Sequence, residues 1–135
     1  MVTLQDVRAW AMTLPRTEEH LIRDHVKFRV GRIVYASISP DETVMGIGFP
    51  REERAAAVAA EPAKFCLPRP GDMRYQWIHV QMAVLSVAEM HELITDAWCM
   101  CVPKRVAAAR LDPGGPAVPP AAPPATTQAT QQEDE

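Results

Sequence analysis

The chain has 135 residues, of which 47% are hydrophobic, and its formal net charge is −3. This length and apolar content are enough for one domain with a substantial core. No apolar run is longer than that of residues 55–60, which is far too short to span a membrane. Three cysteines, and no secretory hydrophobic segment near the N-terminus, favour a reduced, cytoplasmic setting.

The negative charge is concentrated in the C-terminal segment. Residues 1–111 contain 14 Lys and Arg against 13 Asp and Glu, whereas residues 112–135 contain four carboxylates and no cation. Six of the 13 prolines lie between Pro113 and Pro124, and no large apolar residue follows Val118. We therefore predict a folded domain over 1–111 and a disordered Pro/Ala/Thr/Gln-rich tail over 112–135. The near-neutral domain neither requires nor excludes a polyanionic partner.

The N-terminal segment predicts a helix. Thr3 and Asp6 have the spacing of a capping box, and apolar residues recur at helical intervals up to Leu14. Pro15 should end this helix, because the residue before a proline disfavours helical geometry. A short strand is expected over residues 18–22.

A β-hairpin is the clearest local prediction. Residues 26–30 alternate between apolar and charged side chains, and Gly31-Arg32 has the composition of a type II′ turn. A two-residue turn places Lys27 and Arg29 on the open face. The expected register pairs Val30 with Ile33, Phe28 with Tyr35, Val26 with Ser37, Arg29 with Val34, Lys27 with Ala36, and His25 with Ile38.

The rest of the domain completes an α+β fold, an antiparallel meander flanked by N-terminal and C-terminal helices. Ser86 and Glu89 form a second capping box. The expected elements are a strand over 43–49, a helix from Pro50 to about Ala60, a strand over 76–82, and helices over 87–102 and 103–111. The core should join the first helix, the hairpin and the long helix through Trp10, Phe28, Ile33, Leu93 and Trp98.

No catalytic or metal motif is complete. His91 to Thr95 resembles a zinc-peptidase helix without its second histidine. Cys99 and Cys101 have a one-residue spacer, which is neither a redox nor a usual zinc spacing. We expect no enzyme activity, no cofactor and no metal, with His91 facing solvent and Cys101 in the core.

The remaining chemistry is electrostatic. The segment from Arg23 to Arg32 has a local net charge of +3, and a basic two-stranded ribbon is one known way to contact DNA. The alternatives are solvated charges on an open sheet face, or a protein-interaction or small-ligand-binding module near Tyr75 and Trp77. The candidate nucleic-acid-binding residues are Lys27, Arg29, Arg32, Arg74, Lys104 and Arg105.

Several short segments follow one another in a distinctive order: Leu14-Pro15, 28–33, 49–54 before Glu61-Pro62, 77–80 and 103–106. Their order and spacing resemble the MmcQ/YjbR family. The resemblance covers about residues 3–110 and implies a fold similar to that of the frataxin homologue CyaY. It also implies a DNA-binding protein with paired hairpin wings. Two departures are Gly48 and Gln81, where family members commonly carry Lys and Arg. Frataxin-like iron binding is not expected, because Asp6 is the one carboxylate before Leu14.

Overall fold

The computed structural model describes residues 1–111, so the expected C-terminal tail lies outside the described residues. The chain divides into two compact units, Met1–Cys101 and Val102–Glu135. The described part of the second unit contains one helix, α4 (Lys104–Leu111). All other elements belong to the first unit.

The first unit is built on one six-stranded antiparallel sheet with the strand order β1-β2-β3-β4-β6-β5. This confirms the α+β class. The meander extends from β1 to β4, after which β6 pairs with β4 and β5 lies at the edge. The sequence pattern missed β5, because two residues are too few to show alternation. The strands are β1 (Thr17–Ile22), β2 (His25–Val30), β3 (Ile33–Ile38), β4 (Val44–Gly48), β5 (Phe65–Cys66) and β6 (Trp77–Gln81).

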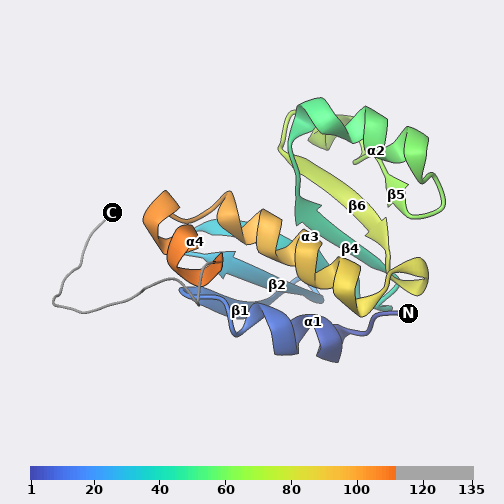
Figure 1. The fold of residues 1–135 in the computed structure, drawn as a ribbon. Helices are drawn as coiled ribbons and strands as arrows, with labels where there is room; N and C mark the ends of the chain where they lie inside the picture. The colour runs from blue at the N-terminus through green and yellow to red at the C-terminus, as the bar shows by residue number, and fades with distance from the viewer. Residues whose placement is uncertain (112–135) are drawn as a thin grey trace, which may run out of the picture. The chain divides into compact units, whose positions relative to one another are not determined.

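Two helices, α1 (Leu4–Ala11) and α3 (Val87–Cys99), lie side by side on one face of the sheet (Figure 1). Both begin with the predicted capping boxes, at Thr3 and Ser86. The predicted helix after Pro50 is a 3-10 turn followed by a short α-helix that packs against β5. The shorter elements are η1 (Arg51–Glu53), α2 (Arg54–Ala60), η2 (Pro70–Asp72) and η3 (Met82–Val84). Among the described residues, no helix has the length and apolar character needed to cross a membrane.

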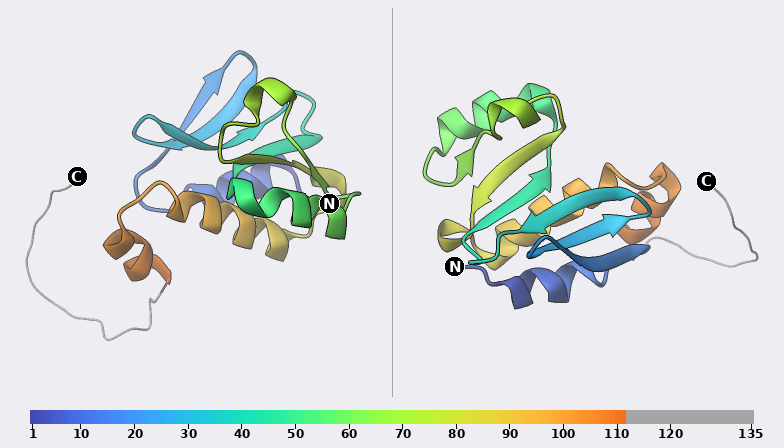
Figure 2. Two further views of the ribbon diagram at one scale, coloured as in Figure 1. Left: turned by 90° about the horizontal axis from the view of Figure 1, so that it is seen from above. Right: turned by 180° about the vertical axis from the view of Figure 1, so that it is seen from behind.

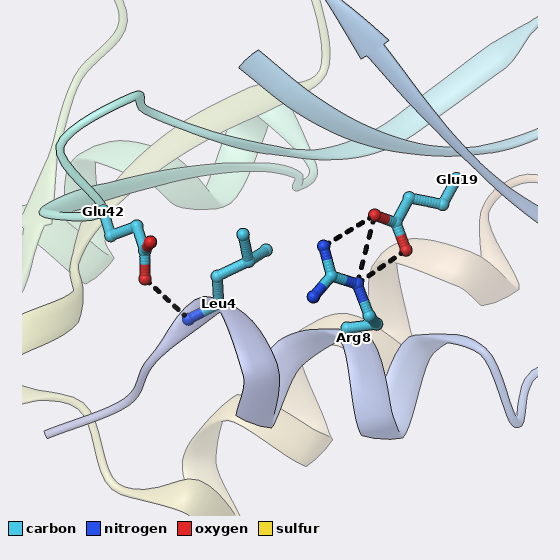
Figure 3. Close-up of polar contacts among 4 residues, drawn as sticks. All are labelled: Leu4, Arg8, Glu19 and Glu42. Atoms are coloured by element: carbon cyan, nitrogen blue, oxygen red, sulfur yellow. Dashed lines mark hydrogen bonds and ion pairs between the residues drawn. The ribbon is translucent and has the colours of Figure 1, made fainter. Parts of the chain in front are cut away.

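Polar contacts attach α1 to the sheet (Figure 3). The Arg8 guanidinium donates to both carboxylate oxygens of Glu19 on β1, at 2.8 to 3.1 Å. The backbone N–H of Leu4 donates to Glu42, which lies in the turn before β4, at 3.3 Å. The first helix is therefore held to the sheet near both of its ends.

The predicted hairpin is present, but a β-bulge changes its register. Val30 pairs with Ile33 and Arg29 with Val34, as expected, while Gly31 takes a positive φ of 59°. Beyond Arg29 the register shifts by one, because Tyr35 is an extra residue on β3. The other four predicted pairs are therefore wrong. The observed pairs are Phe28 with Ala36, Lys27 with Ser37, and Val26 with Ile38.

The core prediction is correct in part. Phe28 and Trp98 are fully buried, Trp10 and Leu93 are half-buried, and Ile33 is 54% exposed. Ile33 lies outside the core because it directly follows the turn. His91 is not simply solvent-facing, since its ring stacks on the Trp10 indole with centroids 3.8 Å apart.

Candidate ligand groove on the open face of the sheet

The face of the sheet opposite α1 and α3 carries a row of side chains from four strands. The register places Lys27 of β2 beside Ser37 of β3, Ser37 beside Gly46 of β4, and Gly46 beside His79 of β6. Because strand residues alternate between faces, the row lies opposite the buried core positions. The right-hand view of Figure 2, taken from behind the molecule, looks onto this face, and α3 lies beyond the strands.

This row forms part of a hollow of about 960 Å³, here called the groove. One end and the middle of the groove are polar, with His25, Lys27, Ser37, Ser39 and His79. The other end is mainly apolar. It is lined by Ile33, Val34, Tyr35, Ala97 and Met100, with Gln76 just beyond the Gly48–Trp77 pair.

The apolar end opens where two strands separate. β3 pairs with β4 only from Ala36 to Ile38, so the first three residues of β3 leave β4 after the bulge. The C-terminal end of α3 approaches β4 there. A Cβ atom added to Gly48 would lie 3.5 Å from the Ala97 Cβ and 3.7 Å from the Met100 Sδ. Helix α3 therefore closes one side of the groove.

Gly46 and Trp77 form the middle of the groove. A Cβ atom added to Gly46 would lie 2.6 Å from the Trp77 Nε1 and within 2.8 Å of two indole carbons. The indole therefore lies directly over Gly46, and only glycine leaves room for it. This placement brings the indole N–H next to the Lys27–Ser37 part of the row.

The titratable groups at the apolar end are neutral. Burial raises the pKa of the Tyr35 phenol to about 12 and the pKa of the Cys101 thiol to about 11. Burial also lowers the pKa of His79 from its ordinary value, which favours the neutral imidazole, with Asp72 opposing this shift. The charge inside the groove is thus concentrated at Lys27, with Arg69 and Asp72 paired at 3.6 Å on its rim.

Lys27, Ser37 and the Trp77 indole N–H make no side-chain hydrogen bond or ion pair with the other described residues. Ser37 as a residue is only 8% exposed. Three hydrogen-bond donors without partners from the described part of the chain therefore come from neighbouring positions of this row. Such groups can donate hydrogen bonds to the oxygens of a bound anion.

The predicted nucleic-acid-binding residues divide among several places. Lys27 lines the groove, whereas Arg29 is half-buried and its Nε has no hydrogen-bond partner among the described residues. Arg32 is exposed in the turn between β2 and β3. The Arg74 guanidinium lies 4.7 Å from the centroid of the Tyr75 ring and donates to the Tyr75 hydroxyl at 2.7 Å.

Lys104 and Arg105 lie elsewhere in the chain. Both are exposed in the first turn of α4, which belongs to the second compact unit. Within the first unit, the structure brings Lys27 and Tyr75, whose ring contacts Arg74, to one groove.

Sequence reasoning missed Ser37, His25 and His79 as groove residues. The alternation of residues 77–80 would have placed Trp77 and His79 on one face of a strand. Ser37 could not have been found, because the predicted register placed it opposite Val26 on the apolar face.

The fold and the groove define an α+β sheet protein that is covered by helices on one face and hollowed on the other. A family model described as YjbR matches residues 12–100. This chain therefore belongs to the YjbR family, as the resemblance indicated. Among curated proteins, none matches the chain.

A solved structure has the same fold. It is the crystal structure of the Deinococcus radiodurans protein DR2400, which contains a DUF419 domain. The two are 18% identical, with a TM-score of 0.65 over 74% of this chain and 78% of that chain. At this identity the similarity concerns the fold alone.

Proposed function

We propose that this protein is a binding protein, not an enzyme, and that it holds an organic anion in the groove. The carrying observation is the Lys27 ammonium, which has no partner among the described residues, in a hollow of about 960 Å³ that it shares with the largely buried residue Ser37. A hollow of this size matches the usual volume of small-ligand sites.

Electrostatics support an anion as the ligand. A charge-assisted hydrogen bond to an ammonium is roughly twice as strong as a neutral one. The bond gains further strength where little water competes, as at the half-buried Lys27. A bound oxyanion would satisfy both the ammonium and the neighbouring hydroxyl donor.

The titration behaviour supports binding in preference to catalysis. The raised pKa values of Cys101 and Tyr35 keep both groups protonated near neutral pH. Protonated thiols and phenols are poor nucleophiles. We place this binding protein in the cytoplasm, where the free thiols Cys66, Cys99 and Cys101 would remain reduced.

Amide NMR spectra of the full chain test this proposal. Acetate, octanoate, phenyl phosphate and adenosine monophosphate are titrated separately. At least one should shift the amides of residues 25–27, 37–39 and 77–79 in a saturable manner, and Lys27→Met should weaken that effect. If all four anions leave these amides unmoved, the groove does not bind organic anions.

Contact with DNA is a second candidate function. It is favoured by Arg29 and Arg32, which lie on one hairpin and have no charged partner among the described residues. With Lys27 they would supply about three phosphate contacts, so binding should fall with salt at a log–log slope of about −2.7. Reversing Arg29 and Arg32 to Glu should flatten that slope. Absence of DNA binding at low ionic strength would reject this candidate and leave the small-ligand proposal untouched.

A further inference from the structure

The groove separates its polar and apolar lining, and this separation restricts the chemistry of its ligand. Resting on the proposed function, we infer that the ligand is an amphiphilic organic anion. Its carboxylate or phosphate head lies at Lys27 and Ser37, and its hydrocarbon body extends toward Ala97 and Met100.

The head position follows from the unpartnered donors. Lys27 and Ser37 are adjacent across β2 and β3, and the Trp77 Nε1 lies over Gly46, the next position in the same row. These groups supply an ammonium, a hydroxyl and an indole N–H, all of which can donate to oxygen. Ser37, a residue that is more than nine-tenths buried, lines the groove, and its hydroxyl has no partner among the described residues.

The position of the ligand's hydrocarbon body follows from the residues at the apolar end of the groove. Ile33 and Met100 are exposed large apolar side chains, and both line the groove with Ala97 and Val34. The titratable groups there, Tyr35 and Cys101, have raised pKa values and remain uncharged. This surface favours hydrocarbon.

The distance between the two ends of the groove fits a single ligand molecule that carries both the head and the body. Ser37 and Ile33 are four residues apart on β3, which is about 13 Å of strand before the bulge shortens it. An inorganic anion would fill only the head position, and a neutral hydrocarbon would leave Lys27 unpaired. A single-chain amphiphile satisfies both ends.

Gly48 keeps the apolar end open. A Cβ atom at this position would be in ordinary contact with Ala97 and Met100, and Gly48 is not among the glycines with a positive φ. A larger side chain can therefore be introduced there without backbone strain, and it would occupy the space assigned to the ligand body.

The experiment measures the binding of octanoate, octyl phosphate, acetate and 1-octanol to the full chain. Binding is followed by the NMR shifts of the amides of residues 25–27, 37–39 and 77–79, here called the groove amides. Octanoate or octyl phosphate should bind about 10-fold or more tightly than acetate and than 1-octanol, as expected when both ends contribute. The stronger of the two anions identifies the head group as carboxylate or phosphate. Equal binding of octanoate, octyl phosphate and acetate, or of these anions and 1-octanol, would overturn the inference.

Two substitutions test the polar end and the apolar end of the groove separately. Lys27→Met should weaken octanoate binding about 10-fold and leave 1-octanol unchanged, while Lys27→Arg should retain most of the octanoate affinity. Gly48→Leu should weaken octanoate about 10-fold and leave acetate unchanged. Arg23→Met, which removes an exposed cation in the turn between β1 and β2, is the matched control and should change nothing.

Thermal melts confirm that each variant is folded. Unchanged octanoate binding in both Lys27→Met and Gly48→Leu would overturn the inference. If acetate or adenosine monophosphate still shifts the groove amides but octanoate and octyl phosphate bind no more tightly than acetate, the inference fails and the proposed anion-binding function stands. If no anion shifts them, both fail.

Discussion

Gly46 and Gly48 stand two residues apart on β4, but their surroundings differ. An added Cβ would meet the Trp77 indole at 2.6 Å at Gly46, and would meet Ala97 at 3.5 Å at Gly48. Real Cβ atoms do not approach as closely as the first distance, so the indole would have to move. The position of the Trp77 indole, and with it the shape of the middle of the groove, therefore depends on the absence of a Cβ atom at Gly46.

Gly46→Ala should consequently destabilise the protein by about 1–3 kcal/mol, the usual cost of overpacking. Gly48→Ala should change the free energy of unfolding by less than about 1 kcal/mol, because the new methyl makes ordinary contacts. Urea unfolding of both variants measures this difference. The tryptophan emission of Gly46→Ala should also shift, and equal stabilities of the two variants would show that the indole does not depend on Gly46.

At the scale of elements, the bulge in β3 decides which hairpin residues are buried. It leaves Phe28 opposite Ala36 in the core and turns Lys27 toward Ser37 and the groove. The same bulge separates the start of β3 from β4, which opens the apolar end of the groove. One extra residue thus shapes both the core and the candidate site.

Phe28→Ala should cost roughly 3–5 kcal/mol of unfolding free energy, because the ring is fully buried. Ile33→Ala should cost less than about 1 kcal/mol, since Ile33 is 54% exposed. Chemical denaturation of the two variants tests the strand faces directly. Similar losses in both would mean that Ile33 is packed and the bulge is misplaced.

At the scale of the whole molecule, shifted pKa values set how stability depends on pH. Burial lowers the pKa of His79 from 6.5, so below that pH the unfolded chain binds a proton that the folded chain refuses. Stability should therefore begin to fall as the pH drops below 6.5. His79→Asn should flatten this part of the profile.

A second loss of stability should occur in acid. A hydrogen bond from Arg8 lowers the pKa of Glu19, and one from Lys64 lowers that of Glu89, both from 4.5. The stability that these carboxylates contribute is present above 4.5 and lost as pH falls through their folded pKa values. Burial raises the pKa of Asp96 and opposes this loss. Urea unfolding across pH 3–7 measures the profile, and an unchanged acid limb in Glu19→Gln would remove Glu19 from this account.

The amino-acid sequence by itself determined the local elements of this protein. The capping boxes at Thr3 and Ser86, the alternation of residues 26–30 and the positive φ of Gly31 depend on residues close in the chain, so each could be predicted from its own segment. The order of several such segments was also enough to indicate the YjbR family.

Only the tertiary structure decided the bulge, the pairing of β6 with β4 and the groove. These features depend on contacts between distant segments: Trp77 with Gly46, Lys27 with Ser37, and the end of α3 with Gly48. A one-residue shift in strand register moves side chains to the opposite face, and nothing within the hairpin's own residues signals that shift. The packing of the whole sheet against α1 and α3 selects the register, and the register places Ser37 and Lys27 together in the groove.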